Sequence, residues 1–231
     1  MEFLSNIELY FSSSVIEDEK KVHLNGDEFY HCIKVMRNKT GDDLYVTDGN
    51  GSIFFCKIST ITKEDLTAGI ITVYKYTDEL KNVTFCIPNL KNPERLKFAI
   101  EKCVELGITS FNFFLAEHSI SKKINRERIE KIILSAMKQS LRSFLPAISI
   151  SGSVSELLQG DAEIIMFDQT SDLKFDSFTL SGKHSYKFLF GPEGGFSESE
   201  YNLLKEAAKF RLTENRLRSE TAIIKAASML G

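Results

Sequence analysis

Strand-like and helix-like segments alternate through residues 83–230, and this alternation is the strongest constraint on the fold. Compact apolar runs typical of buried strands are separated by longer amphipathic segments typical of helices. The strand candidates are residues 83–87, 108–115, 162–167 and 186–190, and the helix candidates are 93–106, 125–141, 197–209 and 219–230. The pattern predicts an α/β layer fold with a largely parallel sheet.

Two of the predicted helices have a clear apolar face, because apolar side chains recur in them every three or four positions. The residues predicted to face inward are Leu96, Ala99, Ile100, Cys103 and Val104 in the first helix, and Ile129, Ile132, Ile133, Ala136 and Ser140 in the second. Gly107 is a good stop for the first of them.

The first 76 residues carry mainly β-sheet signals. Runs of aromatic and β-branched residues occur at 43–48, 52–59 and 66–74. Gly49 and Gly51 flank Asn50 between the first two runs, a sequence that suits a tight hairpin turn. These runs predict a small β-barrel.

One short helix interrupts the β-rich part at residues 27–37. Its spacing places Phe29, Ile33 and Met36 on one face, with Cys32 beside them. The β-rich part ends in a polar stretch at 75–82, which reads as a linker. We therefore expect two domains, residues 1–76 and residues 77–231.

Composition excludes several classes of protein. The chain is 42% hydrophobic and 26% charged, which is ordinary for a globular protein, and no apolar run approaches the roughly 20 residues of a membrane helix. The N-terminal segment has no basic and apolar leader, so we expect a cytoplasmic protein without membrane attachment. The four cysteines lie far apart and the four histidines form no close ligand pair. We therefore expect buried thiols and no metal site.

Charge is unevenly distributed along the chain. The net charge is −3, but residues 81–150 carry a balance of +6 between two acidic segments. A basic central third is compatible with an anion-binding face. The alternative is that these lysines and arginines only solvate two amphipathic helices.

A glycine-rich segment follows the strand candidate at 186–190. It reads GPEGGFS over residues 191–197, and its glycines allow the backbone to turn sharply and to approach a ligand closely. Ser197 with Glu200 forms a capping box that starts the next helix. The pattern is neither an ATP-type phosphate loop nor a Rossmann dinucleotide loop. A tight turn without a ligand remains the alternative.

A second polar segment, LTENRLRSETA, spans residues 212–222. Ser219 or Thr221 is expected to cap the last helix, which places Arg218 and Glu220 at its start. The alternative is a capped helix with solvated charges. No histidine lies near either segment in the sequence, which disfavours a histidine base.

Together the two segments resemble signature motifs of the SPOUT methyltransferases, and more narrowly of the RsmE family, which methylates N3 of a uridine in 16S ribosomal RNA. GPEGGFS matches the family's glycine motif, and LRSETA at residues 217–222 matches its LRTETA with Ser219 for Thr. Weaker similarity covers most of the chain. It consists of three lesser matches. The first is Lys91, Arg95 and Lys102 with Glu105-Leu106-Gly107. The second is Gln139-Ser140 with Arg142 and Pro146, and the third is His31 with Val35-Met36-Arg37. Departures from the family pattern are Thr213 in place of a glycine, Asn215 and Arg216 in place of Arg-Ile, and Glu117-His118-Ser119 at an Arg-Ser position.

The resemblance implies a trefoil-knotted α/β domain that binds S-adenosylmethionine, an N-terminal PUA-like barrel that binds RNA, and a homodimer. By position, the residues implied for the cofactor are Phe167, Phe190, Gly191, Gly194, Gly195, Leu212 and Leu217. The implied partner is 16S ribosomal RNA or the small ribosomal subunit.

Methylation at N3 requires loss of an imide proton and stabilisation of charge on the flanking carbonyl oxygens. Arg218 is the candidate for charge stabilisation, and Glu220 is the candidate for proton acceptance or for orienting Arg218. The candidates for RNA contact are Arg37, Lys91, Arg95, Lys122, Lys123, Arg126 and Arg142. Two alternatives stay open: a related RNA methyltransferase that acts on a ribose 2′-hydroxyl or another base, and a non-catalytic RNA-binding protein.

Overall fold

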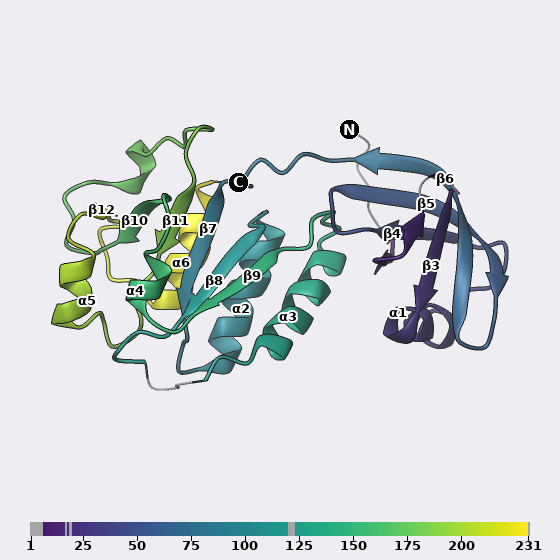
Figure 1. The fold of residues 1–231 in the computed structure, drawn as a ribbon, viewed down its shortest axis with the longest axis horizontal. Coiled ribbons are helices and arrows are strands. Elements are labelled where there is room, and N and C mark those ends of the chain that lie inside the picture. The colour runs from purple at the N-terminus through teal and green to yellow at the C-terminus, as the bar shows by residue number, and fades with distance from the viewer. Residues whose placement is uncertain (1–6, 17, 19, 120–122, 231) are drawn as a thin grey trace. The chain divides into compact units, whose positions relative to one another are not determined.

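The structure is a computed structural model and describes residues 7–16, 18, 20–119 and 123–230 (Figure 1). The chain divides into two compact units. The first comprises residues 1–78 together with 137–145, and the second comprises residues 79–136 together with 146–231. The sequence places a single boundary after residue 76. The structure adds the segment Met137–Leu145 to the first unit.

The first unit is a small barrel. Its strands are β1 (Leu9–Phe11), β2 (Val15–Ile16), β3 (Lys21–Asn25), β4 (Asp43–Thr47), β5 (Ser52–Ile61) and β6 (Asp65–Lys75), in the order β1-β4-β5-β6-β3-β2. The two edge strands β1 and β2 are joined by only three residues. Within this link Ser12 donates its hydroxyl to the carbonyl of His23 at 2.6 Å and its N–H to Thr47 at 3.0 Å. These bonds close the sheet on itself, so the predicted barrel is confirmed.

The predicted hairpin is also confirmed, since β4 and β5 pair antiparallel across the turn at residues 48–51. Gly49 and Gly51 have φ angles of 74° and 98°, which glycine adopts without strain. The segment Met137–Leu145 attaches at this turn: Gly51 N–H donates to the carbonyl of Ser143, and Leu145 N–H donates to that of Gly49. A Cβ at Gly51 would lie 2.5 Å from the ring of Phe144.

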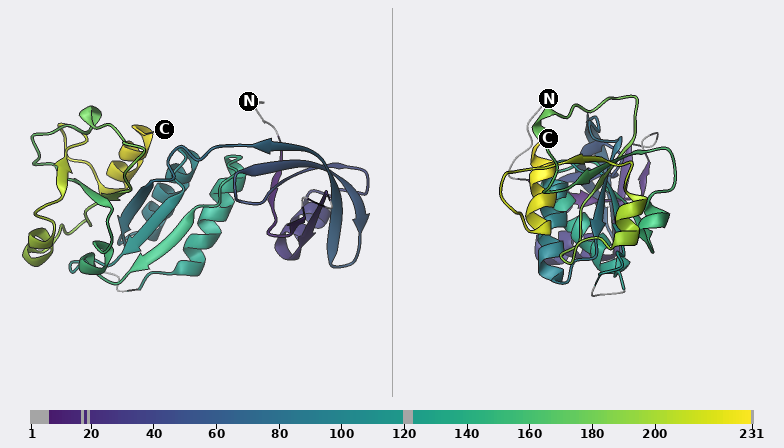
Figure 2. Two further views of the ribbon diagram at one scale, coloured as in Figure 1. Left: turned by 45° about the horizontal axis from the view of Figure 1, so that its top comes forward. Right: turned by 90° about the vertical axis from the view of Figure 1, so that its left-hand side faces the viewer.

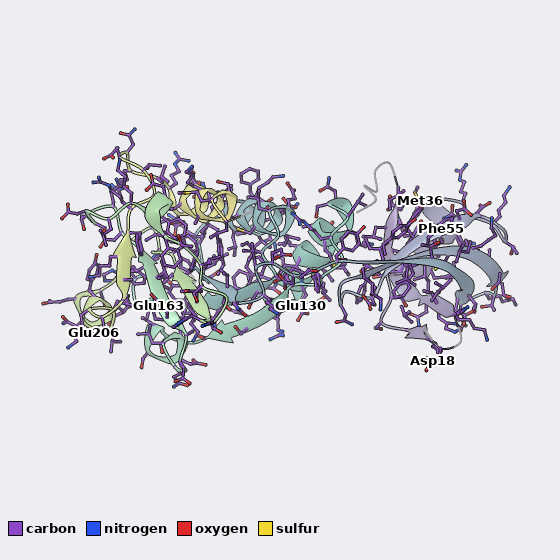
Figure 3. The ribbon with its side chains drawn as sticks, turned by 90° about the horizontal axis from the view of Figure 1, so that it is seen from above. Asp18, Met36, Phe55, Glu130, Glu163 and Glu206 are labelled. Atoms are coloured by element: carbon purple, nitrogen blue, oxygen red, sulfur yellow. The ribbon has the colours of Figure 1, made fainter. Side chains whose placement is uncertain are left out.

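The helical segment of the first unit changes pitch along its length. It begins as α1 (Gly26–Tyr30) and continues as a π-helix over His31–Val35. Phe29 and Cys32 are buried as expected, but the prediction for Met36 is wrong, because this side chain is 45% exposed at the outer surface (Figure 3). The wider π turn, closed by Met36 N–H to the carbonyl of His31, breaks the 3.6-residue period on which the prediction rested.

The second unit is built on a parallel sheet. Its strands are β7 (Val83–Pro88), β8 (Ser110–Phe114), β9 (Ala147–Ser151), β10 (Glu163–Phe167), β11 (Tyr186–Leu189) and β12 (Ala208–Phe210), in the order β12-β10-β11-β7-β8-β9. Every neighbouring pair is parallel. The helices are α2 (Pro93–Glu105), α3 (Arg126–Gln139), α4 (Val154–Leu157), α5 (Glu198–Leu203) and α6 (Ser219–Ser228). The predicted α/β layer fold is confirmed.

Helices cover both faces of this sheet. Helices α2 and α6 pack side by side, and α4 packs with α5; Figure 2 shows α6 on one side of the sheet and α5 on the other. The apolar face predicted for α2 is buried at Ala99, Ile100, Cys103 and Val104, whereas Leu96 is half-buried. On the face of the sheet that α4 and α5 cover, the buried apolar side chains form one core cluster. It includes Cys86, Phe114, Val154, Leu157, Met166, Leu189 and Leu204.

The four cysteines are free and buried, as predicted. Burial raises the pKa of the Cys56 and Cys86 thiols to about 12. Such thiols act as small apolar side chains of the core.

One predicted helix is too long. The segment 197–209 is helical only as far as Leu203, and Ala208–Phe210 forms β12 beside β10 instead. Leu204 turns into the core, and Phe210 lies in register with Phe167. Burial of these side chains outweighs local helix propensity. Within the described residues, no helix has the length and apolar character needed to span a membrane.

Candidate active site

The loops that follow the parallel strands of the second unit lie at one edge of the sheet, where α/β proteins bind ligands. Residues 89–92 follow β7, residues 115–119 follow β8, residues 168–170 follow β10 and residues 190–197 follow β11. The segment 211–218 leads from β12 into α6. Hydrogen bonds join these loops to one another.

The two motif segments meet through Ser219. Its hydroxyl donates to the carbonyl oxygen of Gly191 at 2.9 Å, so the start of α6 is fixed to the glycine loop. The prediction that Ser219 or Thr221 caps α6 is wrong, because the N-cap residue is Arg218 and no side chain caps the helix. The Ser219 hydroxyl is used for the contact between loops instead.

The glycine loop is also held from the side of β7 and β8. The Glu193 carboxylate accepts a hydrogen bond from the backbone N–H of Lys91, at 3.2 Å to the nearer oxygen. A Cβ on Gly194 would lie 3.2 Å from the Cβ of His118. No histidine lies near either motif in the sequence, but the fold brings His118 to Gly194 from 76 positions away.

The predicted capping box is confirmed and has a further partner. Ser197 and Glu200 exchange the two expected hydrogen bonds at the start of α5. The other oxygen of the buried Glu200 carboxylate accepts from the backbone N–H of Glu117 at 2.8 Å. One carboxylate thus fixes the glycine loop to the loop after β8.

The segment 211–218 is held through its backbone. The side-chain amide of Gln169 donates to the carbonyls of Thr213 and Glu214 at 3.2 and 3.1 Å. A hydrogen bond from Lys174, with the nearby charges of Arg211 and Lys174, keeps the pKa of Glu214 below its ordinary value. A cavity of about 250 Å³ lies beside Leu212 and Thr213.

The aromatic residues predicted for the cofactor belong to one cluster. The rings of Phe167 and Phe190 stack with centroids 4.9 Å apart, and Phe167 also meets Phe175 edge to face. Phe190 is buried, whereas Phe167 at the end of β10 is half-buried. Asp168, the next residue, accepts a hydrogen bond from the hydroxyl of Tyr201 in α5. Burial and this bond raise the pKa of Tyr201 to about 12.

The two residues predicted to act in catalysis lie in different surroundings. The Arg218 side chain is exposed at the start of α6, whereas Glu220 is buried. Arg95 Nε lies 3.4 Å from Oε1 of Glu220. Among the described residues the ion-pair partner of Glu220 is therefore Arg95, a residue predicted to contact RNA.

The remaining RNA candidates that the structure describes lie at the surface. Arg37, Lys91 and Lys123 are exposed, and Arg126 is exposed but paired with Glu130 at 2.8 Å. Arg142 is exposed as well, although partial desolvation of its guanidinium lowers its pKa. Lys122 lies outside the described residues. Across the part of the chain that the structure describes, no cluster of three or more His, Cys, Asp or Glu could hold a metal ion.

Comparisons with known proteins agree with this architecture. The family described as RNA methyltransferase domain matches residues 78–231, and the family described as RNA methyltransferase PUA domain matches residues 24–71. The chain is 28% identical to ribosomal RNA small subunit methyltransferase E of Bacillus subtilis, over 93% of this chain and 91% of that protein. The protein of the same name from Rickettsia conorii is also 28% identical, over 94% and 92%.

Solved structures give the same result. A probable rRNA methyltransferase from Porphyromonas gingivalis is 31% identical, with a TM-score of 0.81 over 96% of this chain and 95% of that one. Ribosomal RNA small subunit methyltransferase E of Neisseria gonorrhoeae, solved bound to S-adenosyl methionine, shares the fold at 23% identity, with a TM-score of 0.84 over 96% of each chain.

The parallel sheet, its looped edge and the barrel, together with the two matching families, define an RNA methyltransferase. More narrowly, the chain belongs to the RNA methyltransferase family whose domain spans residues 78–231. The predicted family, fold class and enzyme class are confirmed.

Proposed function

We propose that this chain transfers a methyl group from S-adenosylmethionine to N3 of a uridine in 16S ribosomal RNA. The names of its relatives support the small-subunit RNA as substrate. The observation that carries the proposal is the hydrogen bond from Ser219 to Gly191, which brings the two motif segments together at the strand ends. A protein that only bound RNA would have no use for this junction.

The edge of the sheet fits the cofactor. Gly191, Gly194 and Gly195 present main-chain groups without side chains, and a Cβ at Gly194 would crowd His118. Leu212 and Leu217 are half-buried and offer apolar contact to the adenine, and Phe167 and Phe190 border the same edge. S-adenosylmethionine supplies an activated methyl group when it is bound there.

The residues of this chain have two tasks in the reaction. Glu220 is positioned to accept the proton of N3, and the freed electron pair of N3 would then take the methyl group that bound S-adenosylmethionine would supply. Arg218, a planar cation with several donors, stabilises the charge that develops on the flanking carbonyl oxygens. Holding both reactants in line contributes several kcal/mol, on the order of 7 or more, to lowering the barrier.

RNA binding is assigned to the barrel and to the basic central segment. In this proposal residues 1–76 and the exposed Arg37, Lys91 and Lys123 hold the RNA, with Arg126 and Arg142 nearby in the sequence. The enzyme works in the cytoplasm as a homodimer, the commonest closed symmetry. Light scattering at micromolar concentration tests the dimer, and a fully active monomer contradicts it.

The decisive experiment is mass spectrometry of ribosomal RNA. RNA from a deletion strain is expected to lack one N3-methylated uridine, and purified protein with S-adenosylmethionine is expected to restore it. A methyl group missing from a ribose 2′-hydroxyl or another base instead identifies the related methyltransferase. An unchanged RNA, with no cofactor binding in a calorimeter, identifies a non-catalytic RNA-binding protein.

A further inference from the structure

The carboxylate of Glu220 has two oxygens in unequal situations. The residue is 9% exposed, and Oε1 lies 3.4 Å from Nε of Arg95. Oε2 is buried and forms no hydrogen bond with any residue that the structure describes. A buried carboxylate oxygen without a partner is unfavourable, because it has lost its hydration and gained no hydrogen bond in return. Natural proteins keep few such groups, so this oxygen marks a place where a ligand group is expected.

Both members of this pair stand beside anchor points of the glycine loop. Glu220 follows Ser219, whose hydroxyl is bound to Gly191. Arg95 lies in the first turn of α2, four residues after Lys91, whose backbone N–H is bound to Glu193. Helices α2 and α6 pack side by side, so the pair joins their first turns. Glu220 is therefore fixed relative to the loop from two sides.

We propose that Arg95 is a positioning residue that holds Glu220 so that Oε2 receives the N3 proton of the uracil; this inference rests on the proposed function. The contact with Arg95 fixes Oε1, and Oε2 is the oxygen of this carboxylate that has no partner among the described residues. The N3–H bond breaks toward Oε2, the electron pair of N3 forms the bond to the methyl carbon, and the electrons of the carbon–sulfur bond return to sulfur. Arg95 then acts through Glu220 and does not serve as a phosphate contact.

Two roles for Arg95 predict different measurements. A residue that contacts phosphate contributes to the salt dependence of RNA binding. Loss of one contact changes the slope of log affinity against log salt concentration by roughly 0.7–0.9. A residue that positions Glu220 contributes to the rate of methyl transfer once RNA and cofactor are bound. Its loss also has no further effect when the carboxylate is already gone, because the two groups act as a unit.

The experiment compares Arg95→Ala, Arg95→Lys, Glu220→Gln and the double variant Arg95→Ala/Glu220→Gln in single-turnover methylation of small subunits from the deletion strain. Arg95→Ala is expected to reduce the rate at saturating RNA and cofactor by roughly tenfold or more. Arg95→Lys should recover part of this loss. The double variant should be no slower than Glu220→Gln. The slope of RNA affinity against salt should be unchanged in Arg95→Ala.

The matched control is Lys97→Ala on the same helix, because Lys97 pairs with Glu101 and not with the site. It should leave the single-turnover rate unchanged, and thermal unfolding of each variant checks that the fold is intact. A shallower salt slope with a normal rate at saturating RNA would overturn the inference, as would additive losses in the double variant. If the wild-type protein methylates no uridine at N3, the result contradicts the proposed function and, with it, this inference. A normal wild-type rate with an unaffected Arg95→Ala overturns the positioning role alone.

Discussion

The hydroxyl of Ser219 lies 2.9 Å from the carbonyl oxygen of Gly191, and it is a hydrogen-bond donor where the sequence pattern suggests a helix cap. One side chain thereby fixes the distance between the loop that follows β11 and the start of α6. The glycines assigned to cofactor binding and the residues assigned to chemistry stand on opposite sides of this bond.

Ser219→Ala is expected to weaken cofactor binding moderately. Loss of one neutral hydrogen bond costs about 1 kcal/mol, which corresponds to roughly a fivefold weaker affinity. Ser219→Thr keeps the hydroxyl and should bind S-adenosylmethionine like the wild type in isothermal titration calorimetry. Equal affinities for all three proteins would show that the junction does not shape the cofactor site.

Gly194→Val is expected to abolish cofactor binding. The first atom of the new side chain would lie 3.2 Å from the Cβ of His118, and its branches would need still more room at the loop. Gly182→Val is the control, because a Cβ there meets no atom within 4 Å. Calorimetry with S-adenosylmethionine should show binding only for the control, and wild-type affinity of Gly194→Val would contradict the assignment of this loop.

Arg218→Ala is expected to separate binding from chemistry. Its proposed partner is charge that appears on the uracil only as N3 loses its proton, so the interaction belongs to the transition state. Single-turnover methylation should fall by on the order of 10²-fold or more, while cofactor affinity changes little. Loss of cofactor binding with normal turnover at saturating cofactor would instead assign Arg218 to the cofactor pocket.

Glu200→Gln is expected to destabilise the second unit. Both carboxylate oxygens accept backbone N–H groups, from Ser197 and Glu117, and an amide offers only one acceptor oxygen. One of the two backbone N–H groups would then face the amide NH2 and have no acceptor, which should reduce the free energy of unfolding by about 1–3 kcal/mol. Urea unfolding measures this change, with Glu206→Gln on an exposed side chain as the control. Equal midpoints for both variants would contradict the role of Glu200.

The double variant Lys91→Ala/Lys123→Ala is expected to weaken RNA binding and to reduce its salt dependence, by roughly 0.7–0.9 in slope for each lost phosphate contact. Arg37→Ala tests the barrel in the same way. Both lysines are exposed, and Lys205→Ala removes an exposed lysine from the turn after α5, outside the proposed surface, as a control. Filter binding at several salt concentrations provides the slope of log affinity against log salt concentration. An unchanged slope would show that these side chains are only solvated and do not contact phosphate.

Local signals account for the part of the fold that the sequence predicted. The alternation of strands and helices, the turn at Gly49 and Gly51 and the capping box of Ser197 each depend on neighbours within a few positions. Strands β3 and β9 were missed because polar side chains alternate within them, and β1 was missed because it has only three residues. The pitch change after Tyr30 was also missed, since a π-helix has no distinctive pattern of apolar spacing.

The candidate site was only partly accessible from the sequence. Motif resemblance selected Gly191, Gly194, Arg218 and Glu220 but gave none of their partners. The contacts of Gly194 with His118 and of Glu220 with Arg95 join residues 76 and 125 positions apart. Such pairs are set by the order of the parallel strands and by the packing of α2 on α6. Both depend on residues far apart in the chain, so no local sequence pattern predicts them.

The attachment of Met137–Leu145 to the barrel has a consequence for how the protein is made. A ribosome that has completed β6 has not yet synthesised the segment whose carbonyl and N–H groups pair with Gly51 and Gly49. The barrel therefore reaches its final hydrogen-bonded form only after the chain has been extended to Leu145, through β7, α2, β8 and α3. A gene fragment that ends at residue 78 would encode a barrel with an unpaired turn and with no aromatic side chain to cover Gly51.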